Sequence, residues 1–324
     1  GHEKLIEFKT DCDLFSRLYL ASQSREGDLD EFFRHENQPY PPSLSDRGCL
    51  RFGTKSDLLS CFSTLSDCTM DCSVLNVDCY VLDGAVIVQM LRPECSKTFA
   101  DYKFNIFVPY IASLLKQTSR VDLVFDVYSQ LSLKSSCREK RGSGTRVKVT
   151  ATTKVPSNWQ DFLRVDDNKV ELFHFLADVT ALSVPDRSVV VTFNEQALCT
   201  DELDLTAISP CSHEEADTRM LLHCSHAANF GSKKIAIRTV DTDVVVIAVS
   251  VFDKLGVEEL WVHFGVGKNA RLIAVHDLFG KLGPLKAAAL TVFHAFTGCD
   301  TVSCFYGKGK KTAWDSWSCF PEIT

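Results

Sequence analysis

The sequence predicts an α/β fold, a parallel β-sheet with helices packed on both of its faces. From about residue 74, short apolar runs alternate along the chain with longer stretches of helical spacing. The apolar runs are nearly continuous, which is typical of strands buried on both faces. The chain shows no internal repeat, so a solenoid or a propeller is not expected. Together these observations favour a doubly covered parallel sheet.

The elements follow from this pattern in chain order. Strands are expected where apolar runs are short, at Val77–Leu82, Val121–Phe125, Ser188–Phe193, Lys234–Val240 and Glu259–Phe264. Helices are expected between and after them, at Phe99–Lys116, Trp159–Ala181, Glu215–Phe230, Val244–Leu255 and Leu285–Phe296. Gly231 and Gly256 follow two of these helices, where glycine commonly ends a helix.

The first 73 residues read differently. Leu14–Tyr19 and Leu29–Phe33 have helical spacing, and Pro39, Pro41 and Pro42 then interrupt the chain. We therefore expect a helical or irregular N-terminal extension over residues 1–73 and a main domain over residues 74–324. Because the chain starts at Gly1 without a methionine and stops just beyond a helical segment, we expect it to be a piece of a longer protein, truncated at both ends.

Composition excludes several classes of protein. Hydrophobic residues make up 45% and charged residues 24%, so a disordered or fibrous chain is not expected. No apolar run reaches the roughly 18–20 residues of a membrane helix, and the first residues lack a secretory-leader pattern, so neither a membrane span nor secretion is expected. The 14 cysteines are scattered, which favours reduced thiols inside the cell over a disulfide framework. The net charge of −7 does not suggest nucleic-acid binding, although an acidic metal site would hide a local basic patch.

Aspartates follow three of the predicted strands. Asp83, Asp126 and the pair Asp241 and Asp243 stand where apolar runs end. The carboxyl ends of parallel strands share one edge of a sheet, and ligands bind in the crevice there. In extended chain, Asp241 and Asp243 would point the same way. Any one of these residues could instead form a turn or cap a helix.

Further acids open and close predicted helices. Glu215 and Asp217 stand at a helix start and Asp300 follows a helix end. Ser212 and Glu215 also fit a capping box, in which Glu215 would only bind backbone. Joint ligation by Glu215 and Asp217 requires Glu215 to lie at the helix entrance, because residues two apart in a helix do not share a face.

Clustered carboxylates indicate divalent metals. Their mutual repulsion is costly, and an oxygen-only set of ligands suits Mg²⁺ or Mn²⁺. Two such ions about 4 Å apart stabilise the attacking and leaving oxygens of a phosphodiester. We expect one ion at Asp83, Asp126, Glu215 and Asp217, while Asp241, Asp243 and Asp300 hold a second ion or are shared between the two.

The order of these motifs resembles a known family. Asp83, Asp126, Glu215-Ala216-Asp217, Asp241-Thr242-Asp243 and Gly298-Cys299-Asp300 are similar to the acidic set of the flap endonuclease (XPG-like) branch of the PIN-like nuclease superfamily. A glycine-rich segment, Gly307-Lys308-Gly309-Lys310-Lys311, resembles the turn of that family's helix-turn-helix hairpin, here at residues 298–317. Residues 37–39 and 55–57 also resemble those of mobile-element-like animal proteins.

The resemblance implies a PIN-like, metal-dependent nuclease in the nucleus, with DNA preferred to RNA. It also implies two groups of nucleic-acid contacts: Lys134, Arg138, Lys140 and Arg141 in a basic loop, and Gly307, Lys308, Gly309, Lys310 and Lys311 in the hairpin turn. The chain departs from the family in its long N-terminal extension, in Asp217 where glutamate is common, and in lacking an obvious basic clamp.

Other interpretations remain open. Cys211, His213, His223, Cys224 and His226 are zinc-ligand types, but their spacing matches no zinc motif, and His223 and His226 would share a helix face. The segment Gly265–Lys268 lacks the spacing of a phosphate-binding loop. The main alternative is a catalytically inactive module of the same fold that binds nucleic acid or protein.

Overall fold

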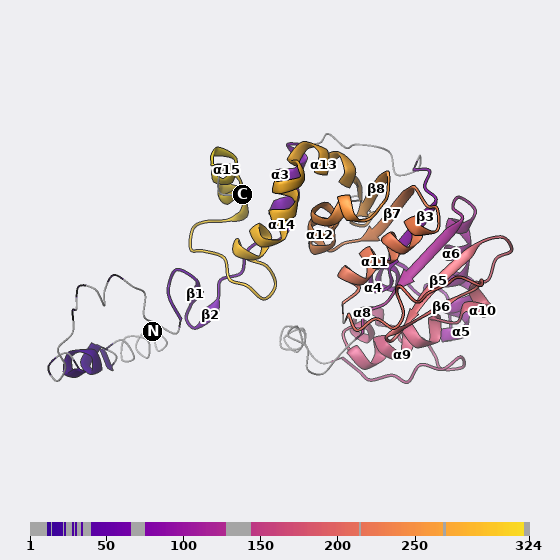
Figure 1. Cartoon of the computed structure of the whole chain (residues 1–324). Coiled ribbons are helices and arrows are strands. Elements are labelled where there is room, and N and C mark those ends of the chain that lie inside the picture. Colours follow the sequence, from indigo (N-terminus) through magenta and orange to yellow (C-terminus); the bar gives the residue numbers. More distant parts are fainter. Residues whose placement is uncertain are drawn as a thin grey trace. The chain divides into compact units, whose positions relative to one another are not determined.

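The computed structural model describes residues 40–65, 75–127, 144–213, 215–267 and 270–320, with individual residues between 12 and 34. Its chain forms two compact units (Figure 1). The larger is built around Ser56–Phe293, and the smaller combines the chain up to Lys55 with His294–Phe320. Packing thus groups residues differently from the predicted domains 1–73 and 74–324, whose boundary stays a prediction.

The larger unit contains a seven-stranded sheet in the order β6-β5-β4-β3-β7-β8-β9. Its strands are β3 (Cys79–Asp83), β4 (Arg120–Val124), β5 (Ser188–Phe193), β6 (Gln196–Cys199), β7 (Lys234–Thr239), β8 (Glu259–Phe264) and β9 (Arg271–Ala274). The five predicted strands pair in parallel, while β6 and β9 are antiparallel strands at the two edges. The predicted α/β class with a parallel core is confirmed, and the edge strands are additions to it.

The strand order reverses at the centre of the sheet. The chain runs from β3 to β4 and β5 on one side, then returns to place β7 on the other side of β3. Asp83 lies opposite Val124 of β4, and Leu82 lies opposite Arg238 of β7, so the three strands end together. In open parallel sheets, such a reversal leaves a crevice at the carboxyl ends of the central strands.

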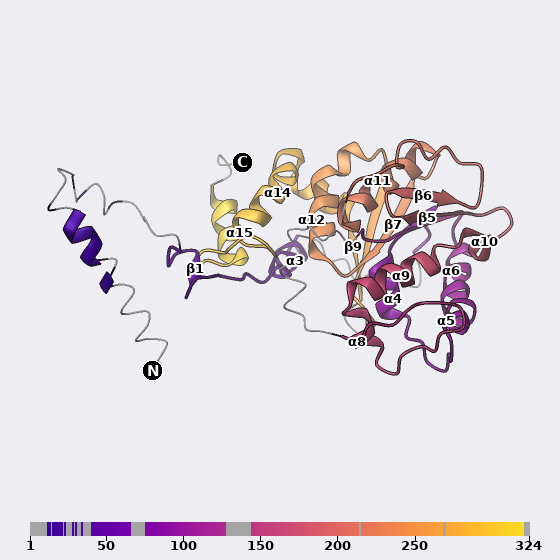
Figure 2. The ribbon, with the colours of Figure 1, turned by 90° about the horizontal axis from the view of Figure 1, so that it is seen from below.

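Helices cover both faces of the sheet. In Figure 2, α11 lies on one face, and α4, α6 and α9 lie on the other. The helices of this unit are α3 (Asp57–Ser63), α4 (Gly84–Met90), α5 (Phe99–Tyr102), η2 (Lys103–Phe107), α6 (Val108–Leu115), α8 (Trp159–Leu163), α9 (Asp166–Leu176), α10 (Val179–Leu182), α11 (Ala216–Asn229), α12 (Thr242–Val251), η3 (Phe252–Lys254) and α13 (Val275–Leu282); α14 (Pro284–Phe296) continues into the smaller unit.

Successive side chains of β3 and β4 point to opposite faces of the sheet. Tyr80 and Leu82 of β3 and Val121 and Leu123 of β4 belong to an apolar cluster that includes residues of α4, α5, α6 and α9. The intervening residues of the same strands face the other way, toward α11, and they include the polar Arg120 and Asp122. The face of the sheet that α11 covers therefore carries a buried ion pair between Arg120 and Asp122.

The predicted helical stretches are helical, but two are segmented. The stretch predicted at Phe99–Lys116 is α5, η2 and α6 in succession, and the one at Trp159–Ala181 is α8, α9 and α10. Helix α4 follows β3 without a loop and was not predicted. Gly84 permits this junction, because a Cβ there would lie 2.2 Å from the ring of Phe125.

The smaller unit joins the two ends of the chain. A short hairpin of β1 (Ser45–Asp46) and β2 (Cys49–Leu50) belongs to it, as does α15 (Lys310–Cys319). The N–H of Tyr306 donates to the carbonyl of Ser43, at 2.8 Å, and the N–H of Cys304 donates to that of Arg51, at 2.9 Å. Residues 41–53 are therefore part of one packed body with the C-terminal hairpin, rather than a free extension.

The N-terminal segment is described only in part. The backbone is helical at residues 15–21, which overlap the first predicted N-terminal helix and extend two residues beyond it, whereas residues 29 and 31–33 of the second lie outside the described residues. Across the part of the chain that the structure describes, every helix is too short or too polar to cross a lipid bilayer.

Candidate metal centre at the carboxyl edge of the sheet

Asp83 ends β3 and begins the next helix at once. Its Oδ1 accepts the N–H of Val86, at 3.1 Å, which makes it the N-cap of α4. Its Oδ2 accepts the hydroxyl of Thr239, the last residue of β7, at 3.1 Å. The side chain is 7% exposed. Asp83 therefore bridges the ends of the two strands between which the sheet order reverses.

Asp126 lies just beyond β4 and caps a helix from another part of the chain. Its Oδ1 accepts the N–H of Ala216, the first residue of α11, at 2.9 Å. Glu215 is the N-cap residue of α11, in extended conformation. The alternative interpretation, a capping box from Ser212 to Glu215, does not hold, because α11 starts after Glu215 and Asp126 accepts the N–H of its first residue. Glu215 does lie at the helix entrance, the position that joint ligation with Asp217 requires.

Asp241 and Asp243 come together through a helix start. Asp241 is the N-cap of α12, and its Oδ1 accepts the N–H of Asp243, at 2.9 Å. Because β7 ends at Thr239, the two aspartates are not in extended chain as the sequence predicted. The turn at the cap brings their side chains together instead.

Three of these carboxylates converge. Asp217, in the first turn of α11, offers a carboxylate oxygen that lies, with one from Asp241 and one from Asp243, in a group within 4.8 Å of one another. All three side chains are partly buried. The group combines Asp217, expected at one ion, with Asp241 and Asp243, expected at the other or shared between the two. It is an oxygen-only set, which suits a hard divalent cation.

The electrostatics of Asp83 extend this cluster. Burial, together with the nearby carboxylates of Asp126 and Asp241, raises the pKa of its carboxyl to about 7, against the hydrogen bonds from Val86 and Thr239, which lower it. The carboxylates of Asp126, after β4, and Asp241, after β7, therefore repel the ionised form of Asp83. Repulsion of this kind favours either a proton or a bound cation at the edge.

Asp300 belongs to the smaller unit. Its Oδ2 is 2.9 Å from Nζ of Lys55, in the same unit. Its expected role at a second ion stays a prediction. The basic loop with Lys134, Arg138, Lys140 and Arg141 lies outside the described residues.

The predicted hairpin turn has exposed and buried lysines. Gly307 has a φ of 66°, Gly309 is the N-cap of α15, and Lys308 and Lys311 are exposed. Lys310 is 1% exposed, and its Nζ donates to the carbonyl of His294, at 2.7 Å, and to Oγ1 of Thr297, at 2.9 Å. The expected phosphate contact from Lys310 is therefore corrected: this ammonium ties α15 to the end of α14.

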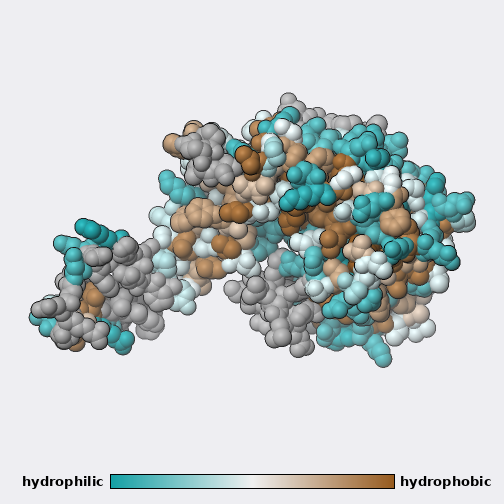
Figure 3. Space-filling view, viewed as in Figure 1, coloured by the Kyte–Doolittle hydropathy of each residue, from teal (hydrophilic) through white to brown (hydrophobic). Residues whose placement is uncertain are grey.

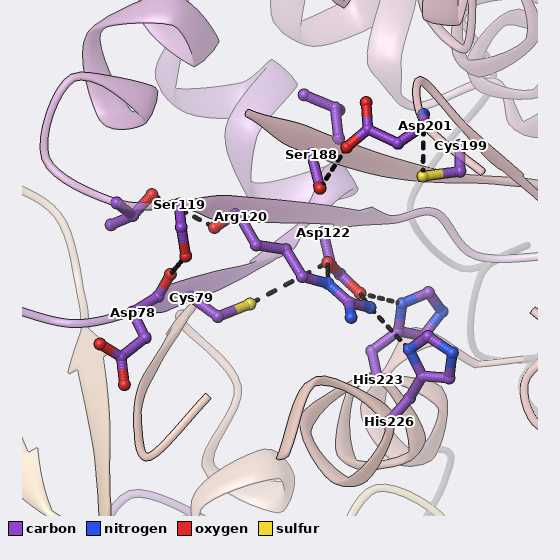
Figure 4. A network of polar contacts seen from close by, with 12 residues as sticks. Asp78, Cys79, Ser119, Arg120, Asp122, Ser188, Cys199, Asp201, His223 and His226 are labelled. Carbon is purple, nitrogen blue, oxygen red and sulfur yellow. Dashed lines mark hydrogen bonds and ion pairs between the residues drawn. The ribbon is translucent and has the colours of Figure 1, made fainter. Parts of the chain in front are cut away.

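A second polar cluster lies on the face of the sheet that α11 covers (Figure 4). Asp122 is fully buried and accepts hydrogen bonds from Nε and Nη2 of Arg120, at 2.6 and 2.7 Å, and from Nδ1 of His223, at 2.7 Å. Although burial raises the pKa of Asp122, Arg120 and His223 together hold it below its usual value. This cluster was not predicted, although an aspartate inside the apolar run of β4 is a signal for it.

The histidines of α11 complete this cluster. Nη2 of Arg120 donates to Nδ1 of His226, at 2.9 Å, and Nε2 of His226 then donates to the carbonyl of Asp204, at 2.8 Å. His223 and His226 thus hold α11 against β4. Among the described residues, the group that could hold a metal is the aspartate triad, which contains no cysteine or histidine. The hydrogen bonds of His223 and His226 therefore favour a structural role for these histidines over zinc ligation.

Comparison with known proteins assigns this chain to no family. The chain matches no protein-family model and no curated protein sequence.

Proposed function

We propose that this protein is a divalent-metal-dependent phosphodiesterase that hydrolyses nucleic acid, DNA in preference to RNA. The observation that carries the proposal is the convergence of Asp217, Asp241 and Asp243 from two helix starts at the edge of the sheet. Asp83 ends β3 and Asp126 follows the adjacent β4 at the same edge. A PIN-like, flap-endonuclease-like relationship is part of the proposal and rests on the resemblance of the motifs.

The residues fit Mg²⁺ or Mn²⁺. The triad would hold one ion, and the proposal places Asp83, Asp126 and Glu215 beside a second. When bound, such ions activate water and stabilise charge on the attacking and leaving oxygens of a phosphodiester. The starts of α11 and α12 also lie at this edge, and helix N-termini favour an anionic phosphate.

Asp83 would help to hold the second ion in the proposal. Its hydrogen bonds from Val86 and Thr239 fix the orientation of the carboxylate. Without metal, burial and the neighbouring carboxylates raise its pKa to about 7, and a bound cation would favour the ionised form.

Calorimetric titration with Mg²⁺ and Mn²⁺ tests the site directly. The variant Asp241→Asn/Asp243→Asn should bind each ion at least about tenfold more weakly, because asparagine keeps the cap of α12 but lacks the charge. Asp201→Asn, on an exposed aspartate bonded to Ser188, is the matched control and should bind like the parent. Equal affinity in the double variant would contradict the metal site.

A cleavage assay tests the reaction. The parent protein should cut at least one of single-stranded, duplex or flapped DNA or RNA when Mg²⁺ or Mn²⁺ is present, and Asp83→Asn should abolish the cut. Because asparagine can still accept the N–H of Val86, Asp83→Asn should keep the fold, which circular dichroism checks. Metal binding without cleavage of any of these substrates would contradict the enzyme and favour the alternative, a catalytically inactive module that binds nucleic acid or protein.

A further inference from the structure

The smaller unit contains a cavity of about 620 Å³ that the acidic edge does not use. All of its lining residues belong to this unit, and they come from the 41–43 segment, the end of α14, the 305–308 turn and α15. A cavity of 300–1,000 Å³ is the usual size for a small organic ligand. The volume therefore suits a group the size of a nucleotide.

Aromatic rings dominate the apolar side of this cavity. Phe296, Phe305 and Tyr306 line it, with the ring centroids of Phe296 and Phe305 5.1 Å apart. Phe296 is 64% exposed and Tyr306 is 71% exposed. Figure 3 shows apolar surface left of centre, on the part of the molecule that carries α14 and α15. Exposed aromatic rings around a cavity mark a binding surface more often than isolated exposed residues do.

Positive charge surrounds the rings. The guanidinium of Arg51 lies 4.6 Å from the centre of the Tyr306 ring, Lys308 lines the cavity, and Lys311 is exposed at the start of α15. Gly309, the N-cap of the ten-residue α15, supplies no side-chain cap, and Thr312 of its first turn also lines the cavity. A helix N-terminus beside lysines favours a phosphate.

The walls of the cavity are held in place. Lys310 ties the start of α15 to the carbonyl of His294 and the hydroxyl of Thr297 at the end of α14. The N–H of Tyr306 donates to Ser43 from the opposite segment. The indoles of Trp314 and Trp317 anchor the buried side of α15, with an edge-to-face contact between them at 5.8 Å. The rings are thus presented on a rigid support.

From these features we infer that the cavity binds one unpaired base of a nucleic acid strand. The base stacks on the aromatic rings, and its phosphate lies at the start of α15 beside Lys308 and Lys311. Stacking on aromatic side chains with a cationic backbone contact is how proteins bind single strands without reading sequence. An apolar peptide would use the rings but would gain nothing from the lysines and the helix start.

This inference shares only the class of ligand with the proposed function. The test therefore excludes metal: fluorescence anisotropy in EDTA with a labelled oligothymidylate and with an abasic strand of equal length and charge. The parent should bind the oligothymidylate more tightly. Phe296→Ala should weaken that binding about 5- to 150-fold and leave the abasic strand unaffected. Phe296→Leu, which keeps apolar bulk, should also weaken it.

Charge variants separate stacking from phosphate contact. Lys308→Ala should weaken binding of both strands and lower the slope of log K against log salt by about 0.7. Asp201→Asn, on an exposed aspartate of the larger unit, is the control and should bind both strands like the parent. Because all strands are bound in EDTA, a failure of metal binding at the triad would leave this result unchanged. Equal affinity for the two strands, or unchanged binding by Phe296→Ala with its fold confirmed by circular dichroism, would overturn it.

Discussion

Two aspartates on neighbouring strands have opposite surroundings. Asp122, inside β4, is fully buried between Arg120 and His223, and its pKa is held below the usual range. Asp83, at the end of β3, is almost as buried, but the charges that act on it are the carboxylates of Asp126 and Asp241, and its pKa is raised to about 7. Burial is similar, and the sign of the neighbouring charge differs.

The charge of the neighbouring groups indicates that Asp122 supports the fold, whereas Asp83 is available for chemistry. Asp122 is neutralised within the chain and ties α11 to β4. Asp83 is held with other acids at the crevice, where its charge is costly. Since perturbed carboxyl groups gather at functional sites, the carboxyl edge is the better candidate, and the Asp122 cluster is its support.

The largest expected effect comes from breaking the neutralised cluster. Asp122→Asn should lower the free energy of unfolding by about 3–5 kcal/mol, because the Arg120 guanidinium stays buried without its counterion. The shift in the urea midpoint measures this loss. Arg120→Met/Asp122→Leu, which removes both charges, should recover most of it.

The acidic edge should respond differently to the same chemistry. Asp241→Asn/Asp243→Asn should cost no more than about 0.5 kcal/mol of unfolding free energy in EDTA, because it removes like charges and keeps the cap. Losses of equal size at Asp122 and at this pair would remove the distinction between the two regions.

The next effect is a pH dependence that belongs to Asp83. Its pKa is about 7 in the folded protein against an ordinary 3.8, so the folded state holds the proton more tightly. Stability in EDTA should therefore fall as pH rises from about 4 to about 7, by at most about 4 kcal/mol, and level off above that. Asp83→Asn should flatten this slope in unfolding titrations.

The pH dependence of stability that Asp122 contributes should have the opposite sign. Because its pKa is lowered, its contribution is complete at neutral pH and is lost only as pH falls below the ordinary carboxyl range. Parallel stability profiles of the parent and of Asp83→Asn between pH 4 and 7 would show that the pKa of Asp83 is not raised in the folded protein.

Stabilisation by metal is expected to be smaller than the loss at Asp122 or the pH dependence of Asp83. At a hundredfold excess over its Kd, Mg²⁺ or Mn²⁺ should add about 2.7 kcal/mol to the free energy of unfolding, seen as a rise in Tm. Asp217→Asn should reduce this increment, whereas Asp201→Asn should keep it. A full increment in Asp217→Asn would place the bound ion away from the triad.

Much of the fold could be predicted because the parallel strands are continuous apolar runs. Ser188–Phe193 and Glu259–Phe264 match their strands at both ends. The edge strands β6 and β9 were missed, since each has only four residues and lacks such a run. Helix α4 was missed because Asp83-Gly84 is typical of a turn, whereas here glycine allows the helix to start beneath Phe125.

Prediction of the site succeeded on position and failed on local geometry. Apolar runs that end in aspartate locate Asp83, Asp126 and Asp241 near the ends of β3, β4 and β7. That Asp126 would cap α11 depends on a contact 90 residues apart, which local spacing does not contain. Burial of Lys310 was missed for the same reason, because only its tertiary partners distinguish it from Lys308 and Lys311.

The reversal of strand order has a consequence for how the chain is made. Thr239, which bonds Asp83, lies 156 residues after it, so β3 is synthesised long before its neighbour β7. At 5–20 residues per second, the interval is roughly 8–30 s. During that time one side of the central strand lacks its partner, and the ribosome has not yet delivered two of the three aspartates of the triad. The acidic edge is therefore one of the last features of the sheet to be completed, and any chaperone that holds the nascent chain meets β3 with an open edge.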